Sequence, residues 1–270
     1  MLQVCLHGRG GQGVVTASEM LAQSAFSEGH QVQAFPSFGS ERMGAPVIAF
    51  VRISDTPITT HEPILTPDAV VVQDATLMDT LDVFAGLAPD GWAVVNTLAS
   101  ATEVRAAHAG APAENHIAAI PADAIVRLYL GANKPSAAML GAFAALTGSV
   151  SLDSAVASIN KRFSGRVAAG NVSAARIAYA WVERARTGGG DVSGGGDGGA
   201  GSAGDAGAGD SATAGSVTEA VVALGQELGI DDPRIRKQPA PDQPARNQPA
   251  QNQPAQIQST QNQPGQGGAA

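Results

Sequence analysis

The chain has 270 residues, a formal net charge of −8 at pH 7 and one cysteine, Cys5. A single cysteine excludes a disulfide framework and any cysteine-ligated iron–sulfur cluster within this chain, and the five histidines lack the spacing of a metal finger. The sequence has no basic stripe for nucleic acid, no apolar run near the roughly 18 residues of a membrane span, and no secretory signal. We therefore expect a cytoplasmic protein that binds neither nucleic acid nor a membrane.

All aromatic side chains lie before residue 187, and we predict one globular domain over residues 1–186. Apolar runs predict strands at residues 2–6, 31–35, 47–53, 68–73, 92–96 and 116–120. Apolar residues at helical spacing predict helices at residues 14–27, 77–84, 122–130, 136–147, 152–162 and 173–186. Because strands alternate with helices, the expected fold is α/β. It is a Rossmann-like sandwich with a largely parallel sheet, a helical C-terminal part and then a disordered tail.

The composition changes after residue 186. Residues 187–216 are almost wholly Gly, Ala, Asp and Ser, which is typical of a flexible linker. Apolar residues at helical spacing predict a short helix within residues 217–237, either docked on a partner or isolated and weak, and we favour the isolated helix. Residues 238–270 repeat Gln-Pro-Ala and Asn-Gln-Pro, which predicts a disordered, partly polyproline tail.

A glycine-rich loop follows the first predicted strand and precedes the first predicted helix. Its residues are Gly8, Arg9, Gly10, Gly11, Gln12 and Gly13, with the spacing G-x-G-x-x-G. Glycines allow close backbone approach, and the free N–H groups at a helix start bind an anion, usually a phosphate. A dinucleotide site also needs an acidic residue after the second strand, but Phe35 and Pro36 stand there and Glu28 comes too early. The alternative to a phosphate site is a loop that needs its glycines only for packing.

A second polar loop, residues 36–46, follows the second predicted strand. It carries Ser37, Glu41 and Arg42 together with two glycines. In a parallel sheet this loop emerges at the same edge as the glycine loop, where α/β proteins bind ligands. We therefore predict a binding loop, with a polar surface loop and an incidental ion pair as the alternative.

Other polar positions give weaker signals. Asp74 either caps the next helix or contacts a ligand, Asn96 and Thr97 have the same two explanations, and Lys134 is interpreted as a loop cation. The sequence contains no nucleophile elbow, no P-loop and no telling pair of a histidine with a carboxylate, and we expect Cys5 to be a small buried hydrophobe. We therefore assign no catalytic residue to this chain.

Five segments, in this order, resemble the gamma subunit of 2-oxoacid:ferredoxin oxidoreductases, especially the pyruvate enzyme. They are GRGGQGVVTASEMLAQSA, QAFPSFGSERMGAPVIAFVRISDTPI, VVQDATLMD, WAVVNT and KPSAAMLGAFAALTGSVSLDSAVASI. The resemblance covers about residues 2–181 and is much more specific than the glycine loop alone. One departure is that related domains often carry Arg-Gly-Gly where this chain has Met43, Gly44 and Ala45.

The resemblance implies a role within a complex. The family's complex converts a 2-oxoacid and coenzyme A to acyl-CoA, carbon dioxide and reduced ferredoxin. Thiamine diphosphate lies between the alpha and beta subunits, and the iron–sulfur clusters lie in beta and in a ferredoxin-like delta subunit. For this chain the resemblance implies no cofactor bound by the chain alone and assembly with alpha, beta and delta subunits. It also implies contact between residues 8–13 and the phosphates of coenzyme A.

Ser37, Glu41 and Arg42 of this chain match the second signature loop of the family that it resembles. The resemblance favours pyruvate without excluding other 2-oxoacids. Two alternatives to the complex stay open. One is a free-standing module that binds coenzyme A or a nucleotide, and the other is a purely structural subunit whose glycine loop binds nothing.

Overall fold

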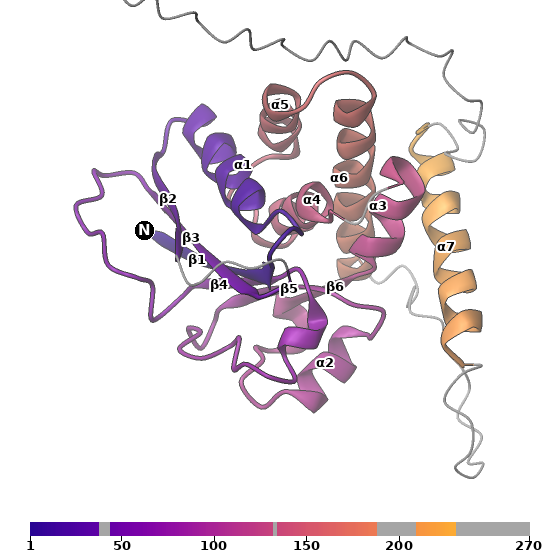
Figure 1. Cartoon of the computed structure of the whole chain (residues 1–270), viewed down its shortest axis with the longest axis horizontal. Coiled ribbons are helices and arrows are strands. Elements are labelled where there is room, and N and C mark those ends of the chain that lie inside the picture. The colour runs from indigo at the N-terminus through magenta and orange to yellow at the C-terminus, as the bar shows by residue number, and fades with distance from the viewer. Residues whose placement is uncertain (38–43, 132–133, 188–208, 231–270) are drawn as a thin grey trace, which may run out of the picture. The chain divides into compact units, whose positions relative to one another are not determined.

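The computed structural model describes residues 1–37, 44–131, 134–187 and 209–230 of the chain (Figure 1). The predicted tail at residues 238–270 and most of the predicted linker at residues 187–216 lie outside these described residues. Within the described part, no helix combines the length and the apolar character that crossing a membrane requires.

Six strands form one sheet in the order β2-β3-β1-β4-β5-β6. Their bounds are β1 Leu2–Arg9, β2 Gln31–Ser37, β3 Pro46–Ser54, β4 Ala69–Val72, β5 Trp92–Asn96 and β6 Ile117–Ile120. The pairs β1–β4, β4–β5 and β5–β6 are parallel, whereas β3 runs antiparallel to both β1 and β2. The connection from β2 to β3 is too short for a parallel crossover, which needs about a dozen residues, so β3 turns back beside β2. The predicted α/β fold with a largely parallel sheet is confirmed, with β3 as the exception.

The sheet buries both of its faces, because its side chains alternate between two hydrophobic cores. Along β1, Val4 and Leu6 belong to the first core and Cys5 belongs to the second. The helices are α1 Val14–Ser27, α2 Ala101–Ala107, α3 Ala122–Leu130, α4 Ser136–Thr147, α5 Leu152–Arg162, α6 Gly165–Arg186 and α7 Gly209–Glu227. Figure 1 shows a thick layer of helices over one face, with α1 and α4 nearest the sheet, and the single helix α2 on the other face.

The connection between β4 and β5 differs from the prediction. We expected a helix over residues 77–84, but the chain forms a short 3₁₀ helix, η1 (Ala75–Leu77), and then tight turns. In one of these turns the N–H of Ala85 donates to the carbonyl of Asp82 at 3.2 Å. Asp79 and Asp82 favour turns over a helix, because short carboxylate side chains compete for nearby backbone N–H groups.

Two helices were missed or shortened by the sequence prediction. The sequence prediction missed α2. This helix has a capping box, in which Ser100 and Glu103 each bond the other's backbone N–H, and a serine followed three residues later by a glutamate is the sequence signature of such a box. The helix α6 begins at Gly165, before the predicted start. Gly170 lies inside it, where a Cβ would come within 2.8 Å of the Tyr129 carbonyl oxygen, so this glycine serves a close contact with α3 rather than a helix break.

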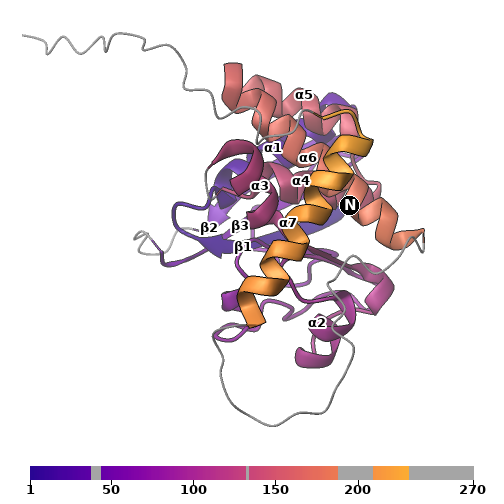
Figure 2. The ribbon, with the colours of Figure 1, turned by 90° about the vertical axis from the view of Figure 1, so that its right-hand side faces the viewer.

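A seventh helix, α7, packs against α3 and α6, beside α3 in both views (Figures 1 and 2). It begins at Gly209, inside the range predicted as a linker. Its residues Val221 and Leu224 are buried in the first core, and Arg184 on α6 forms an ion pair with Glu227 at 2.9 Å. The predicted isolated helix is therefore wrong, because the apolar stripe is buried against the same chain.

The helices α4 and α6 approach each other closely at Gly141. A Cβ at this position would overlap the carbonyl oxygen of Ala175 on α6. Because both groups belong to the backbones of packed helices, neither can move away without disturbing the core.

We expect Gly141→Ala to lower the free energy of unfolding by about 1–3 kcal/mol, because the added methyl group overpacks the α4–α6 contact. The matched control is Gly215→Ala, also inside a helix, where a Cβ meets no atom within 4 Å. This control should be neutral or stabilising by up to about 1 kcal/mol, since alanine favours the helix. Urea unfolding of the two variants measures the difference, and equal effects would contradict the close contact.

Candidate functional site

The glycine loop leaves β1 and enters α1 at the carboxyl edge of the sheet. Gly11 and Gly13 have φ values of 95° and 85°, in the left-handed region that favours glycine. Gly13 caps α1 without a side-chain hydrogen bond, and among the described residues no acceptor meets the first-turn N–H groups of Val14 and Val15. The loop therefore presents unpaired donors at the positive end of a helix dipole, an arrangement that binds anions.

Two glycines of the loop are also required by packing. Ser136 at the start of α4 donates its hydroxyl to the Gly13 carbonyl at 2.9 Å, and a Cβ on Gly13 would lie 2.5 Å from that hydroxyl oxygen. A Cβ on Gly8 would lie 2.6 Å from a methyl group of Val14. The packing alternative weighed from the sequence thus explains part of the pattern, at Gly8 and Gly13.

The end of the second loop lies against the glycine loop. The N–H of Gly10 donates to the carbonyl of Ala45 at 2.9 Å, and the N–H of Gly44 donates to the carbonyl of Gly10 at 3.1 Å. Because β3 runs antiparallel to β1, the start of β3 lies at the edge where β1 ends. The two predicted loops therefore meet there.

Of the three site residues predicted in the second loop, the structure describes Ser37. It ends β2, is exposed, and pairs with Ile48 of β3, which in turn pairs with His7 of β1. Ser37 therefore lies two strands away from the strand that carries the glycine loop. Glu41 and Arg42 lie outside the described residues.

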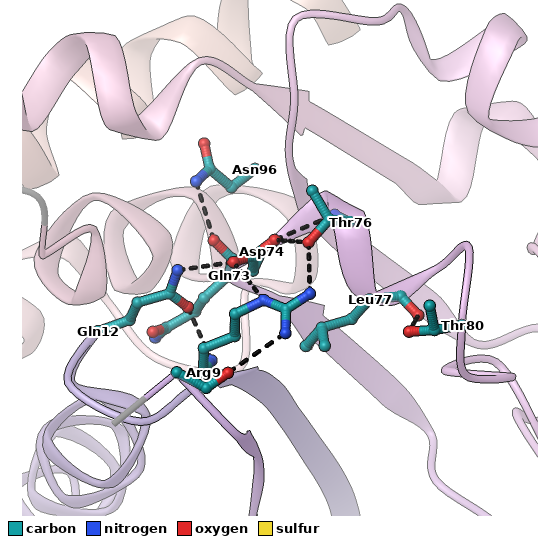
Figure 3. A network of polar contacts seen from close by, with 9 residues as sticks. Arg9, Gln12, Gln73, Asp74, Thr76, Leu77, Thr80 and Asn96 are labelled. Carbon is teal, nitrogen blue, oxygen red and sulfur yellow. Dashed lines mark hydrogen bonds and ion pairs between the residues drawn. The ribbon is translucent and has the colours of Figure 1, made fainter. Parts of the chain in front are cut away.

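The carboxylate of Asp74 connects the glycine loop to the end of β4 (Figure 3). Its Oδ2 atom accepts hydrogen bonds from Gln12 Nε2 at 2.8 Å and from Arg9 Nε at 3.1 Å. Its Oδ1 atom accepts from the backbone N–H and the hydroxyl group of Thr76. The other guanidinium nitrogens of Arg9 donate to the Thr76 hydroxyl at 2.8 Å and to the Gly44 carbonyl at 3.2 Å. Arg9 and Asp74 thus join three segments of the chain.

These contacts hold Asp74 in its charged form. Burial acts to raise the pKa of Asp74, but hydrogen bonds from Thr76 and Gln12 and the charge of Arg9 more than offset it, so the pKa lies below its ordinary value. Asp74 also caps η1 through the Thr76 N–H, the first of its two predicted explanations. The sequence predicted Arg9 and Gln12 as cofactor contacts, and the structure shows both side chains engaged within the protein.

Gln73 belongs to this edge, and sequence reasoning missed it. The residue is 1% exposed, and neither polar atom of its side-chain amide has a hydrogen-bond partner among the described residues. The side chain extends from the end of β4 toward Gln12 and the glycine loop, where a Cβ on Gly8 would lie 3.2 Å from the Gln73 Cβ (Figure 3). A buried amide without partners costs about 1–3 kcal/mol, so Gln73 is a candidate to contact a ligand or a bound water at this edge. A glutamine that ends an apolar strand was the signal in the sequence.

His7 and Cys5 on β1 do not have the properties of catalytic groups. Burial lowers the pKa of His7 to about 4, so the imidazole is neutral at pH 7. Burial raises the pKa of Cys5 to about 12, and the charge of Arg52 opposes this shift only in part. The thiol therefore stays protonated and unreactive, as expected for a small buried hydrophobe.

Asn96 and Thr97 have structural contacts at the end of β5. The side-chain amide of Asn96 donates to the Gln73 carbonyl at 2.9 Å and accepts from the Asp123 N–H at 3.2 Å. The Thr97 hydroxyl accepts from the Ala99 N–H at 3.1 Å. These contacts support a structural role for Asn96 and Thr97 rather than contact with a ligand.

The fold and this edge define an α/β domain whose glycine loop presents the N–H groups of a helix start at the carboxyl edge of the sheet. A family model described as pyruvate ferredoxin/flavodoxin oxidoreductase matches residues 3–181. The pyruvate synthase subunit PorC of Methanothermobacter marburgensis is 46% identical over 179 residues, which are 66% of this chain and 96% of that protein. The pyruvate/ketoisovalerate oxidoreductases common subunit gamma of Thermococcus litoralis has the same identity and the same coverage of both chains.

A solved structure agrees with these relatives. The pyruvate oxidoreductase subunit PORC from Thermotoga maritima is 36% identical with a TM-score of 0.59, over 66% of this chain and 95% of that chain. The chain therefore belongs to the pyruvate ferredoxin/flavodoxin oxidoreductase family, as one of its gamma-type chains. The resemblance inferred from the five sequence segments is confirmed.

We expect Asp74→Asn to lower the free energy of unfolding by about 1–3 kcal/mol at neutral pH. The reason is that Arg9 and Gln12 bond a charged carboxylate more strongly than a neutral amide. The folded pKa of Asp74 is lowered, so the carboxylate stabilises the fold above the unfolded pKa of about 3.9. This stabilisation is lost as the pH falls from there through the folded pKa.

Urea unfolding across this pH range measures the effect, with the exposed Asp79→Asn as the control. The difference between wild type and Asp74→Asn should shrink at the acid end. A difference that does not change with pH would show that the charge of Asp74 does not stabilise the loop.

Proposed function

We propose that this chain is the gamma subunit of a 2-oxoacid:ferredoxin oxidoreductase complex. The complex oxidatively decarboxylates a 2-oxoacid with coenzyme A to acyl-CoA, carbon dioxide and reduced ferredoxin. The observation that carries the proposal is the family match over residues 3–181, together with relatives that are named as gamma-type subunits of pyruvate oxidoreductases. The chain contributes assembly and a ligand contact, while other subunits perform the redox chemistry.

The composition supports this division of labour. One cysteine cannot supply the thiolate ligands of an iron–sulfur cluster, and Cys5 is buried with a raised pKa. We therefore assign the clusters and the thiamine diphosphate to the alpha, beta and delta subunits, with ferredoxin as the electron acceptor of the complex. An assembly of this kind fits the expected cytoplasmic location.

The choice of 2-oxoacid is assigned to the other subunits. The relative from Thermococcus litoralis is named as a gamma subunit common to pyruvate and ketoisovalerate oxidoreductases, so its name assigns one gamma chain to two oxidoreductases. We propose pyruvate for the present complex, because another relative, from Methanothermobacter marburgensis, is named a pyruvate synthase subunit.

The glycine loop is proposed to contact a phosphate group of coenzyme A. Three observations support this assignment: the unpaired N–H groups of Val14 and Val15, the left-handed glycines at the start of α1, and the unpaired amide of Gln73 behind the loop. Arg9 and Gln12 then serve to hold the loop in shape, since Asp74 binds both of their side chains.

The purified full-length chain should show no reduction of ferredoxin with pyruvate and coenzyme A, because the redox centres lie in other subunits. An anaerobic assay of ferredoxin absorbance measures this. The tagged chain, isolated from its own cells, should bring with it chains that contain thiamine diphosphate and iron–sulfur clusters. Turnover by the chain alone would contradict the proposal. Recovery of a lone monomer would favour the free-standing binding module.

The phosphate contact is tested at Thr16, which lies in the first turn of α1. Thr16→Glu places a carboxylate where the helix dipole tolerates it, but where it repels a phosphate. We expect the KM of the complex for coenzyme A to rise at least about tenfold, whereas the uncharged Thr16→Gln should stay close to wild type.

Pantetheine, which carries no phosphate, is the ligand control. Its binding should be the same in Thr16→Glu and Thr16→Gln. If both variants also bind coenzyme A equally well, the phosphate contact is wrong, and the structural alternative for the glycine loop is favoured.

A further inference from the structure

A cavity of about 380 Å³ lies at the carboxyl ends of β5 and β6. One wall is the end of β5 and the segment after it, with Asn96 and Leu98, another is α3, with Asp123 and Arg127, and a third is α7, with Val217. The volume is in the range of small-molecule sites. In α/β sheets, ligands bind at the carboxyl ends of the strands.

Two oppositely charged side chains of this cavity make no direct salt bridge within the part of the chain that the structure describes. Asp123 and Arg127 stand one turn apart on α3, and neither forms a salt bridge with any described residue. Burial raises the pKa of Asp123, a hydrogen bond from Asn96 and the charge of Arg127 oppose the shift only in part, and the charge of Asp74 adds to it. Arg127 is exposed and attracts the Asp123 carboxylate without a direct contact, so each group can still bind an oppositely charged group of a ligand.

The rest of the lining is largely apolar. It consists of Leu98, Pro121, Ala124, Leu128 and Val217, with the hydroxyl-bearing Thr97 and Thr218 beside them. Asn96 is already bonded to Gln73 and to the backbone of Asp123, so its amide adds little to recognition. A complementary ligand therefore carries one positive group, one negative group and an apolar body.

We propose that this cavity binds an apolar α-amino acid. The ammonium group pairs with Asp123, the carboxylate pairs with Arg127, and the side chain lies against Leu98 and Val217. Residues at positions i and i+4 of a helix have Cβ atoms about 5–6 Å apart, a spacing that two neighbouring charged groups of one small molecule can match. Charge-assisted hydrogen bonds at both ends give the specificity for a zwitterion.

The helix α7 forms one wall of this cavity and lies outside the family domain. The family match ends at residue 181, and the aligned part spans 96% of the relative from Methanothermobacter marburgensis, whereas α7 begins at Gly209. The wall that contains Val217 therefore belongs to an extension beyond the family domain. A ligand that contacts α7 stabilises the docked helix, so ligand binding and α7 docking are linked.

The probes are L-leucine, 3-methylbutylamine, which lacks the carboxylate, and 4-methylpentanoate, which lacks the amine. Titration calorimetry on the full-length chain should show L-leucine binding at least about tenfold more tightly than either analogue. Asp123→Asn should remove the preference for L-leucine over 4-methylpentanoate. Arg127→Gln should remove the preference over 3-methylbutylamine.

The role of α7 is tested with two adjacent substitutions. Leu224 is 4% exposed, and Leu224→Asp should detach α7 and abolish L-leucine binding, whereas Ala223→Asp on the exposed side should leave binding unchanged. Amide hydrogen exchange over residues 215–230 reports whether α7 is docked. The proposal is overturned if L-leucine does not bind, if Asp123→Asn binds it normally, or if binding survives in Leu224→Asp with α7 detached.

Discussion

The carboxylate of Asp74 holds together three chain segments that are far apart in the sequence. Through Arg9 and Gln12 it fixes the glycine loop after β1, through Thr76 it starts η1, and through Arg9 it reaches the carbonyl of Gly44 before β3. A loop fixed in this way keeps the N–H groups of α1 aimed in one direction before any ligand arrives. For the phosphate contact proposed above, such preorganisation lowers the conformational entropy lost on binding.

The asymmetry of the two sheet faces follows from where the connections run. The links from β4 to β5 and from β5 to β6 cover one face with turns and the short helix α2. The other face carries α1 and the C-terminal helices, and it is this thick layer that provides an apolar surface on α3 and α6 for α7. The extension thus adds a helix beside the carboxyl edge of β5 and β6.

Much of the fold was predictable because the elements obey local rules. The helices α1, α3, α4 and α5 have the predicted bounds, since apolar spacing agrees there with the flanking glycines and prolines or, for α5, with the cap Ser151. The capping box of Ser100 and Glu103 was equally visible and was missed. The site was harder to predict. The loop Gly8–Gly13 has a recognisable pattern, whereas Gln73 became a candidate only when its burial without partners was seen.

The sequence by itself determined the α/β class, the glycine loop at a helix start and the family, because each depends on residue type and spacing along the chain. The tertiary structure alone decided what the polar side chains do. Arg9 carries a guanidinium that any ligand phosphate would attract, but the folded chain places Asp74 beside it and uses that charge internally. The stripe that contains Leu224 predicted a helix, but its burial depended on the apolar surface of α3 and α6. Contacts between segments distant in sequence are set by the packing of the whole chain, which local patterns do not encode.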